Sequence, residues 1–385
     1  MKTLLHTALL FALAIQLVAQ TSSEPPIDWK KAQSLLQRSQ RGGKLDAEEQ
    51  AYLDRAKKMR QQGQRPNSSA APKGEPFKQA ALTDLKGSYK SQTGGLYGEG
   101  KNEPPAKQLK AAQAAAKQIQ PLDAEGKPAA KGKIVLASIG MSNTTQEFSN
   151  FVKLANGDPA KSESLVIVDG AQGGRDSRAW LTTEGKEDNG RTSPWDVLLQ
   201  RLKAAGVTPA QVQVLWIKQA HISPANLGEF PKHAETLEAH LQFIVQHAKK
   251  TFPNLRLAYL SSRTYAGYAT TQLNPEPYSY ESAFSVRWLI ERQIKGDATL
   301  NFDAAKGEVK SPILLWGPYL WTNGTEGRSI DDLKWTTGDV ANDGTHPSAN
   351  GQRKIAELLL NFLKTDSTAQ GWFLKTSSAK TPVTK

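Results

Sequence analysis

The sequence predicts an α/β domain with a flavodoxin-like, doubly wound sheet of five parallel strands and helices on both faces. The main observation is a series of short apolar runs, rich in β-branched residues, in the C-terminal two thirds of the 385-residue chain. These runs lie at residues 133–139, 164–168, 212–217, 255–260 and 313–316. Stretches with the spacing of amphipathic helices follow them at residues 145–155, 194–205, 234–251, 278–295 and 348–363. Buried strands that alternate with helices form parallel sheets, and right-handed crossovers place the helices on both faces.

The first twenty residues have the pattern of a secretory signal peptide. Lys2 precedes an almost wholly apolar segment, Leu4 to Val18, and small or polar residues follow at Ala19 and Gln20. This apolar segment is short for a transmembrane helix, and no later segment of the sequence approaches the length of a membrane span. We therefore expect cleavage after residue 19 or 20 and a secreted or periplasmic protein, with an uncleaved anchor as the alternative.

Further segments flank the predicted α/β domain, which we place at residues 132–365. Residues 21–62 indicate two short helices, and Asp46 followed by Glu49 fits a capping box at the start of the second. Residues 63–80 are rich in Gln, Pro, Ser and Lys, which is typical of a linker. We expect residues 81–131 to be a lead-in region that packs on the α/β domain. Residues 366–385, rich in Lys, Thr and Ser, are expected to be a disordered tail.

Composition excludes several kinds of site. The chain has no cysteine, so it has no disulfide, no thiol nucleophile and no cysteine-ligated zinc. No His, Asp or Glu cluster has the spacing of metal ligands, and neither a metal nor a cofactor is predicted. The net charge is +12, and residues 21–131 contain 20 Lys or Arg against 12 Asp or Glu. Because aromatic residues do not interleave with these basic residues, we interpret them as a solvated surface and expect no nucleic-acid partner.

Polar motifs follow the predicted strands at the points where the strands end. They are Gly140-Met141-Ser142-Asn143, Gly173-Gly174-Arg175, Gln219-Ala220-His221 and, before the last helix, Asp343-Gly344-Thr345-His346. Each motif alone has an ordinary structural explanation, such as a helix N-cap or a turn. Their joint position is more informative, because ligands of an open parallel sheet bind beyond the carboxyl ends of its strands.

These motifs resemble the sequence blocks of the SGNH hydrolase superfamily. The likeness is to the branch with a Gly-x-Ser-Asn block, which includes sialate O-acetylesterase-like and other carbohydrate acetylesterases, and it covers roughly residues 133–364. The resemblance implies that Ser142 is the nucleophile, His346 its base and Asp343 the residue that orients the base. It also implies an oxyanion hole formed by the backbone N–H groups of Ser142 and Gly173 (or Gly174), with the Gln219 amide as a third donor. In this sequence Ala220 stands where the branch has a glycine, and Gln219 stands at the superfamily's usual Asn position.

The expected partner is an acylated polysaccharide or a small ester. Six residues are candidates for substrate binding: Asn143, Gly174, Arg175, His221, Tyr265 and Trp321. Further aromatic residues near the predicted cleft are Trp180, Tyr268, Trp316 and Tyr319, and aromatic rings suit the C–H faces of sugars, although core packing is the simpler explanation for each. Two alternatives stay open: an esterase for lipids or small acyl esters, and a non-catalytic binding protein that keeps the fold. The oligomeric state is not indicated by the sequence.

Overall fold

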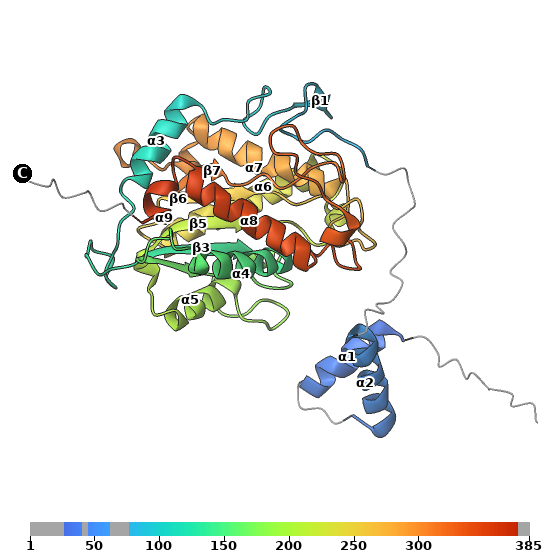
Figure 1. Cartoon of the computed structure of the whole chain (residues 1–385). Coiled ribbons are helices and arrows are strands. Elements are labelled where there is room, and N and C mark those ends of the chain that lie inside the picture. The colour runs from blue at the N-terminus through green and yellow to red at the C-terminus, as the bar shows by residue number, and fades with distance from the viewer. Residues whose placement is uncertain (1–26, 41–44, 62–76, 376–385) are drawn as a thin grey trace, which may run out of the picture. The chain divides into compact units, whose positions relative to one another are not determined.

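The computed structural model describes residues 27–40, 45–61 and 77–375, which belong to two separate compact units (Figure 1). The first unit lies within Met1–Asn67 and the second within Ser68–Lys385. The predicted signal peptide at 1–20, residues 63–76 of the predicted linker and residues 376–385 of the predicted tail lie outside the described residues.

The first unit is a pair of helices, α1 (Trp29–Gln40) and α2 (Ala47–Gln61). The capping box is present: Asp46 Oδ1 accepts from the Glu49 N–H at 2.8 Å, and Glu49 Oε2 accepts from the Asp46 N–H at 3.1 Å. Ile27, Ala32 and Ala56 form its small core, and Tyr52 packs against them. Tyr52 of α2 links this helix to the start of α1, because its hydroxyl accepts from the Asp28 N–H at 2.6 Å.

The second unit contains the predicted five-stranded parallel sheet. Its strands are β3 (Ile134–Gly140), β4 (Leu165–Val168), β5 (Val212–Lys218), β6 (Leu257–Ser261) and β7 (Ile313–Trp316). They lie in the order β4-β3-β5-β6-β7, and every neighbouring pair is parallel. This is the doubly wound order in which the second strand of the chain lies outside the first. The predicted fold class is therefore confirmed.

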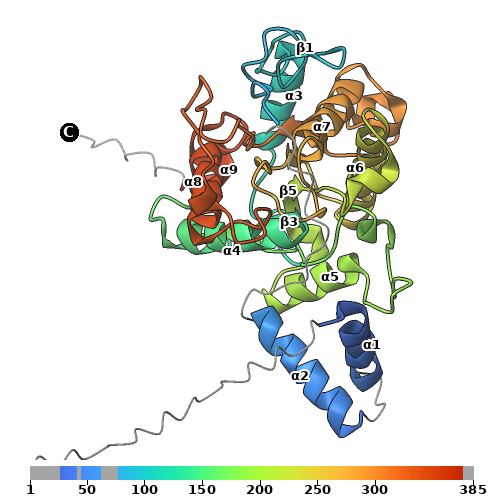
Figure 2. The same cartoon turned by 90° about the vertical axis from the view of Figure 1, so that its right-hand side faces the viewer.

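Helices cover both faces of this sheet (Figures 1 and 2). The major helices are α4 (Ser142–Gly157), α5 (Pro194–Ala204), α6 (Lys232–Thr251), α7 (Tyr278–Ile294) and α8 (Ala349–Thr365). α4 and α8 pack against each other on one face, and α5, α6 and α7 lie on the other (Figure 2). Short 3₁₀ turns occur at Ala179–Leu181, Pro209–Gln211, Pro224–Leu227, Ala298–Leu300, Ala304–Lys306 and Thr337–Asp339.

The strands carry apolar residues at nearly every position because helices cover both of their faces. All seven residues of β3 and of β5 are buried. Phe148 of α4 stacks on Trp216 of β5 with ring centroids 5.6 Å apart, so the helix and the sheet share one core. Serine caps begin two helices: Ser193 accepts from the Trp195 N–H before α5, and Ser348 accepts from the Gly351 N–H before α8.

The lead-in region packs against one edge of the domain, where β7 and α7 lie. It contains the strands β1 (Ser88–Tyr89) and β2 (Gln92–Thr93) and the helix α3 (Ala106–Ala116). Its contact with α7 centres on Glu281, whose carboxylate accepts from the Tyr89 hydroxyl at 2.6 Å and the Lys90 ammonium at 2.8 Å and pairs with His233 Nε2 at 2.7 Å. Burial opposes charge on Glu281, but the bonds from His233, Lys90 and Tyr89 outweigh it and lower the pKa of this carboxyl.

The C-terminal segment differs from the expected disordered tail over residues 366–375. A short helix, α9 (Gln370–Phe373), packs on the domain, and Trp372 and Phe373 are buried. Leu374 then forms a β-bridge with Lys161. The Lys, Thr and Ser content that indicated disorder is an average over residues 366–385. The adjacent side chains of Trp372 and Phe373 are sufficient to anchor residues 366–375.

The part of the chain that the structure describes contains no helix long and apolar enough to span a membrane.

We predict that Glu281 is the main polar anchor of the lead-in region. Glu281→Ala leaves the buried His233 and the half-buried Tyr89 without their acceptor, and should lower the free energy of unfolding by about 3 kcal/mol. Lys90→Ala is the matched control, because the Lys90 side chain is 46% exposed and its loss should cost less than about 1 kcal/mol. Urea unfolding at pH 7 measures both, and equal losses for the two variants would contradict the prediction.

Candidate active site

Ser142 lies at the sharp turn between β3 and α4. Met141 is the last extended residue, with φ −110° and ψ −160°, and Ser142 opens the helix, three residues earlier than the sequence pattern indicated. Only glycine fits at position 140, because a Cβ there would lie 2.3 Å from Thr144 Oγ1. As the first residue of α4, Ser142 has a backbone N–H with no acceptor inside the helix. The turn thus presents a hydroxyl beside free N–H donors.

The structure brings Ser142, His346 and Asp343 into one hydrogen-bonded line. Ser142 Oγ lies 2.8 Å from His346 Nε2, and His346 Nδ1 lies 2.6 Å from Asp343 Oδ2. Ser142 and His346 are 204 positions apart in the chain, so their contact is a product of the fold. The His346 side chain is 20% exposed and Asp343 13%, so solvent reaches both.

Hydrogen bonds hold Asp343 in its charged form. Its other oxygen, Oδ1, accepts from the backbone N–H groups of His346 at 2.9 Å and Thr345 at 3.0 Å. Burial alone would favour the neutral acid, but these bonds, together with the one from the His346 ring, outweigh it and hold the pKa of Asp343 well below its usual range. The carboxylate therefore fixes both the backbone and the ring of His346.

Asn143 ties the histidine loop to the serine turn. Its side-chain amide donates to the Thr345 carbonyl oxygen at 2.8 Å, and the residue is 1% exposed. The sequence suggested Asn143 as a substrate-binding residue, but its buried amide instead joins the two segments that carry Ser142 and His346.

The predicted oxyanion loop is a tight turn next to the serine turn. The Gln172 N–H donates to the Gly140 carbonyl oxygen at 3.1 Å, and the Arg175 N–H closes the turn on the Gln172 carbonyl oxygen at 3.3 Å. Gly173 and Gly174 are exposed, and Gly174 has a φ of 70°, which favours glycine. No described residue accepts a hydrogen bond from the Gly173 N–H, so this group is available to a ligand.

Gln219 lies immediately behind this loop. Its side chain is buried, and its amide nitrogen donates to the Arg175 carbonyl oxygen at 3.3 Å. The second amide N–H makes no hydrogen bond within the described parts of the chain, and it is the group left for the oxyanion role implied by the sequence resemblance.

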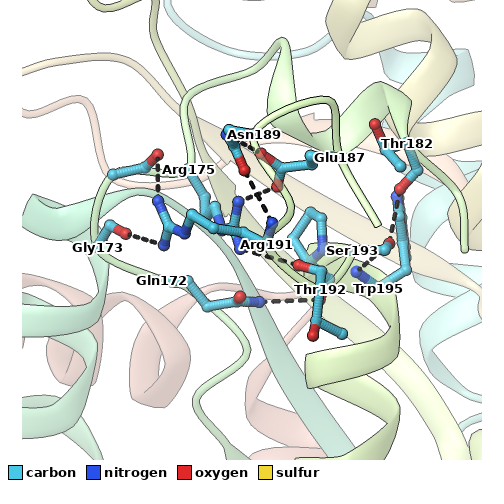
Figure 3. A network of polar contacts seen from close by, with 12 residues as sticks. Gln172, Gly173, Arg175, Thr182, Glu187, Asn189, Arg191, Thr192, Ser193 and Trp195 are labelled. Atoms are coloured by element: carbon cyan, nitrogen blue, oxygen red, sulfur yellow. Dashed lines mark hydrogen bonds and ion pairs between the residues drawn. The ribbon is translucent and has the colours of Figure 1, made fainter. Parts of the chain in front are cut away.

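Three of the predicted substrate-binding side chains are buried in other contacts. Arg175 forms an ion pair with Glu187 and donates to the Thr192 carbonyl oxygen at 2.8 Å (Figure 3). His221 lies 3.0 Å from the Ser177 hydroxyl, and burial lowers its pKa to about 3. Trp321 is fully buried. All three side chains turn into the protein, which does not favour contact with a substrate.

The aromatic residues near the site are mostly core. Trp180, Trp316 and Tyr319 are buried, and Tyr265 is only 7% exposed, with its ring edge-on to those of Trp321 and Tyr268. Tyr268 is half-buried and is the one member of the predicted aromatic set that keeps a partly open face. Its neighbour Thr270 donates its N–H to the Asp343 carbonyl oxygen at 3.0 Å, which places this segment beside the histidine loop.

A buried set of charges lies beneath the serine turn, and the sequence interpretation missed it. Lys218, the last residue of β5, pairs with Glu147 of α4, its ammonium lying 2.7 and 2.6 Å from the two carboxylate oxygens. Burial raises the pKa of Glu147 and lowers that of Lys218, while the partner's charge opposes each shift. Arg263, also fully buried, adds a second cation close to Glu147 and Asp343. The signal in the sequence was a lysine at the end of an apolar strand.

Asp169 fastens the ends of β3 and β4 together. Its carboxylate accepts from the Ser138 hydroxyl at 2.7 Å and from the Ser149 hydroxyl at 3.1 Å, and it also binds the Thr145 hydroxyl. Arg201 of α5 donates to the Asp169 carbonyl oxygen at 2.7 Å. β4, the strand that precedes the predicted oxyanion loop, is therefore held from both faces of the sheet.

Comparisons with known proteins give little beyond this geometry. No protein-family model matches the sequence, and no curated protein matches it significantly. Among solved structures, the chain is similar to a "putative acylhydrolase" from Bacteroides fragilis NCTC 9343, with 15% sequence identity. The match covers 67% of this chain and 96% of that chain, with a TM-score of 0.34. A likeness at this level says nothing about activity.

We predict that Glu276 makes the domain less stable as the pH rises from 4.5 to 8. The carboxyl of this half-buried residue accepts from Trp321 Nε1 at 2.7 Å and from two backbone N–H groups, and burial raises its pKa to about 7. The folded state therefore binds the proton more tightly than the unfolded chain, so the stabilisation is complete below pH 4.5 and is lost through pH 7. The shift corresponds to roughly 3 kcal/mol.

Chemical denaturation of wild type and Glu276→Gln at several pH values tests this. The wild-type free energy of unfolding should fall relative to that of the variant between pH 4.5 and 8, because the amide does not titrate. Parallel pH profiles would show that Glu276 has an unperturbed or lowered pKa.

Proposed function

We propose that the protein is a serine esterase that transfers an acyl group from its substrate to Ser142 and then to water. The observation that carries this proposal is the hydrogen-bonded line from Ser142 Oγ through the His346 ring to the Asp343 carboxylate. A serine hydroxyl is a weak nucleophile unless a base removes its proton during attack. A base in contact with the hydroxyl, itself oriented by a carboxylate, has the arrangement of serine hydrolases on several unrelated folds.

The chemical steps follow from this geometry. Ser142 Oγ attacks the ester carbonyl carbon while His346 Nε2 takes the hydroxyl proton, and the carbonyl oxygen becomes an oxyanion. Collapse of the tetrahedral intermediate breaks the bond to the alcohol oxygen, which leaves with the proton from His346. Water then attacks the acyl-Ser142 ester with His346 again as the base, and the second tetrahedral intermediate breaks its bond to Ser142 Oγ, which recovers the proton from His346 as the carboxylic acid leaves. Asp343 stabilises the transient imidazolium in both halves.

The oxyanion is proposed to bind the backbone N–H groups of Ser142 and Gly173, with the free N–H of Gln219 as a further donor. Two observations support this role: the Ser142 N–H is in the first turn of α4, and the Gly173 N–H has no acceptor among the described residues. Preorganised donors of this kind are each worth on the order of 3 kcal/mol in the transition state.

We propose that the substrate is an O-acetyl group on a carbohydrate and that the protein encounters it outside the cytoplasm. The support is the Gly-x-Ser-Asn resemblance, the signal-peptide pattern of residues 1–20 and the polar surroundings of the site, where Gly173, Gly174, Arg178 and Arg191 are exposed. Among the aromatic residues, half-buried Tyr268 supports this proposal. Four others are buried and do not support it: Trp180, Trp316, Tyr319 and Trp321.

Turnover of p-nitrophenyl acetate tests the catalytic proposal. We expect Ser142→Ala to lower kcat by at least about 10⁴-fold, because no other hydroxyl is in contact with His346 in the described structure. Ser149→Ala is the matched control, since Ser149 lies on the same helix but contacts Asp169 instead of His346. Equal turnover by wild type and Ser142→Ala would exclude the triad, and absence of turnover in both would favour the non-catalytic binding protein.

Acyl-chain and alcohol preference test the proposed substrate. We expect wild type to release acetate from acetylated xylan, pectin or sialoglycans faster than it cleaves long-chain acyl esters, since a polar, exposed site offers no binding energy to a long acyl chain. Acetate release and fatty-acid release are measured at equal ester concentration. Faster cleavage of long-chain esters would favour the lipid esterase instead.

A further inference from the structure

Arg191 is an exposed residue whose guanidinium lies on the oxyanion loop. Its Nη2 donates to the Gly173 carbonyl oxygen at 3.0 Å, and its Nη1 donates to the Gly174 carbonyl oxygen at 3.4 Å (Figure 3). One planar cation thus holds two successive carbonyl groups of the turn. Arginine suits such a bidentate contact because its N–H groups form a rigid fork.

The turn needs a restraint of this kind because of its composition. Gln172–Arg175 is closed by one backbone hydrogen bond of 3.3 Å, and a positive φ at its third residue, Gly174, is the type II pattern. Two adjacent glycines allow the peptide between them to rotate at little cost, since neither has a Cβ. Rotation of this peptide would exchange the directions of the Gly173 carbonyl and the Gly174 N–H. A carbonyl oxygen turned toward a developing oxyanion would repel the charge that the site has to stabilise.

The surrounding loop places Arg191 before any substrate arrives. Lys186 and Thr192 form a β-bridge, and the Asn189 side chain accepts from the Arg191 N–H at 3.0 Å. Arg175, whose own backbone closes the oxyanion turn, donates to the Thr192 carbonyl oxygen (Figure 3). The loop of residues 185–193 and the turn it contacts are therefore linked on both sides of Arg191.

The contacts of Arg191 leave it no competing structural role. Within the described residues its guanidinium makes no ion pair, whereas the neighbouring Arg175 is neutralised by Glu187. The two glycine carbonyls are its only side-chain hydrogen-bond partners there. A Cβ at Gly174 would lie 3.1 Å from Arg191 Nη1, so the turn and the guanidinium are in close contact.

We propose that Arg191 is a positioning residue for the oxyanion hole. It holds the Gly173 and Gly174 carbonyl oxygens on the guanidinium, so that the Gly173–Gly174 peptide cannot rotate and turn the Gly173 carbonyl oxygen toward the reacting carbonyl. The proposal rests on the esterase function proposed above. Arg191 acts through the turn and is not assigned a contact with the substrate.

Steady-state kinetics with p-nitrophenyl acetate give the first test. Arg191→Ala should lower kcat about ten- to thirtyfold, less than the loss of a direct donor, with KM changed by less than about twofold and an unchanged shape of the pH–rate profile. Arg191→Lys should recover part of the rate, because an ammonium can bind one carbonyl. Arg353→Ala is the control, since Arg353 is exposed and makes no ion pair in the described structure. An unchanged kcat in Arg191→Ala, alongside an inactive Ser142→Ala, would overturn the role of Arg191 and leave the esterase proposal intact.

A second readout does not depend on turnover. In ¹⁵N-glycine-labelled protein, Gly173→Ala and Gly174→Ala assign the two amide signals of the turn. We expect these signals to shift or broaden in Arg191→Ala and to stay in place in Arg353→Ala. If both signals are unchanged in Arg191→Ala, the guanidinium does not hold the turn and the proposal is wrong, whether or not the wild-type protein hydrolyses esters.

Discussion

The turn from β3 into α4 is the constraint on which the rest of the site depends. Gly140 approaches Thr144 so closely that no side chain fits, and the Thr144 hydroxyl donates to the carbonyl oxygen of Lys218 at 2.8 Å. The Gly140 carbonyl oxygen in turn accepts from the Gln172 N–H. The ends of β3 and β5 and the loop after β4 are thus fastened at one point. The position of Ser142 relative to the loop after β4 follows from these few contacts.

Much of the fold was predictable because burial leaves a simple pattern. Strands covered on both faces are apolar throughout, so β3, β5 and β7 could be located to within about one residue from their sequences. The three residues of the Ser142–His346–Asp343 line could also be selected, because a parallel sheet brings all its strand ends to one edge and because the motifs there resemble the SGNH sequence blocks. Residues 366–375 were predicted wrongly because composition averaged over twenty positions obscured the short segment that contains Trp372 and Phe373.

The direction of individual side chains was not predictable in the same way. Arg175, His221 and Trp321 lie at the expected edge, yet each turns inward to a partner that is distant in sequence or in a neighbouring loop. Arg191 and Lys218 were missed for the related reason that their partners are backbone carbonyls or a buried carboxylate. Local spacing reports which face of an element is apolar, but it carries no information about which polar groups meet across the fold.

The lead-in region has a consequence for how this domain could be transferred between proteins. Leu96 supplies the carbonyl oxygen that accepts from Trp316 Nε1 at 2.7 Å, and the Leu82 N–H donates to the Tyr319 hydroxyl at 3.1 Å. Residues upstream of the first sheet strand therefore complete the hydrogen bonds of buried rings at the far edge of the sheet. A gene fusion that begins at residue 132 would leave those rings with unmet polar atoms, so a transferable domain has to include the chain from Leu82 onward, well before the pattern of strands and helices begins.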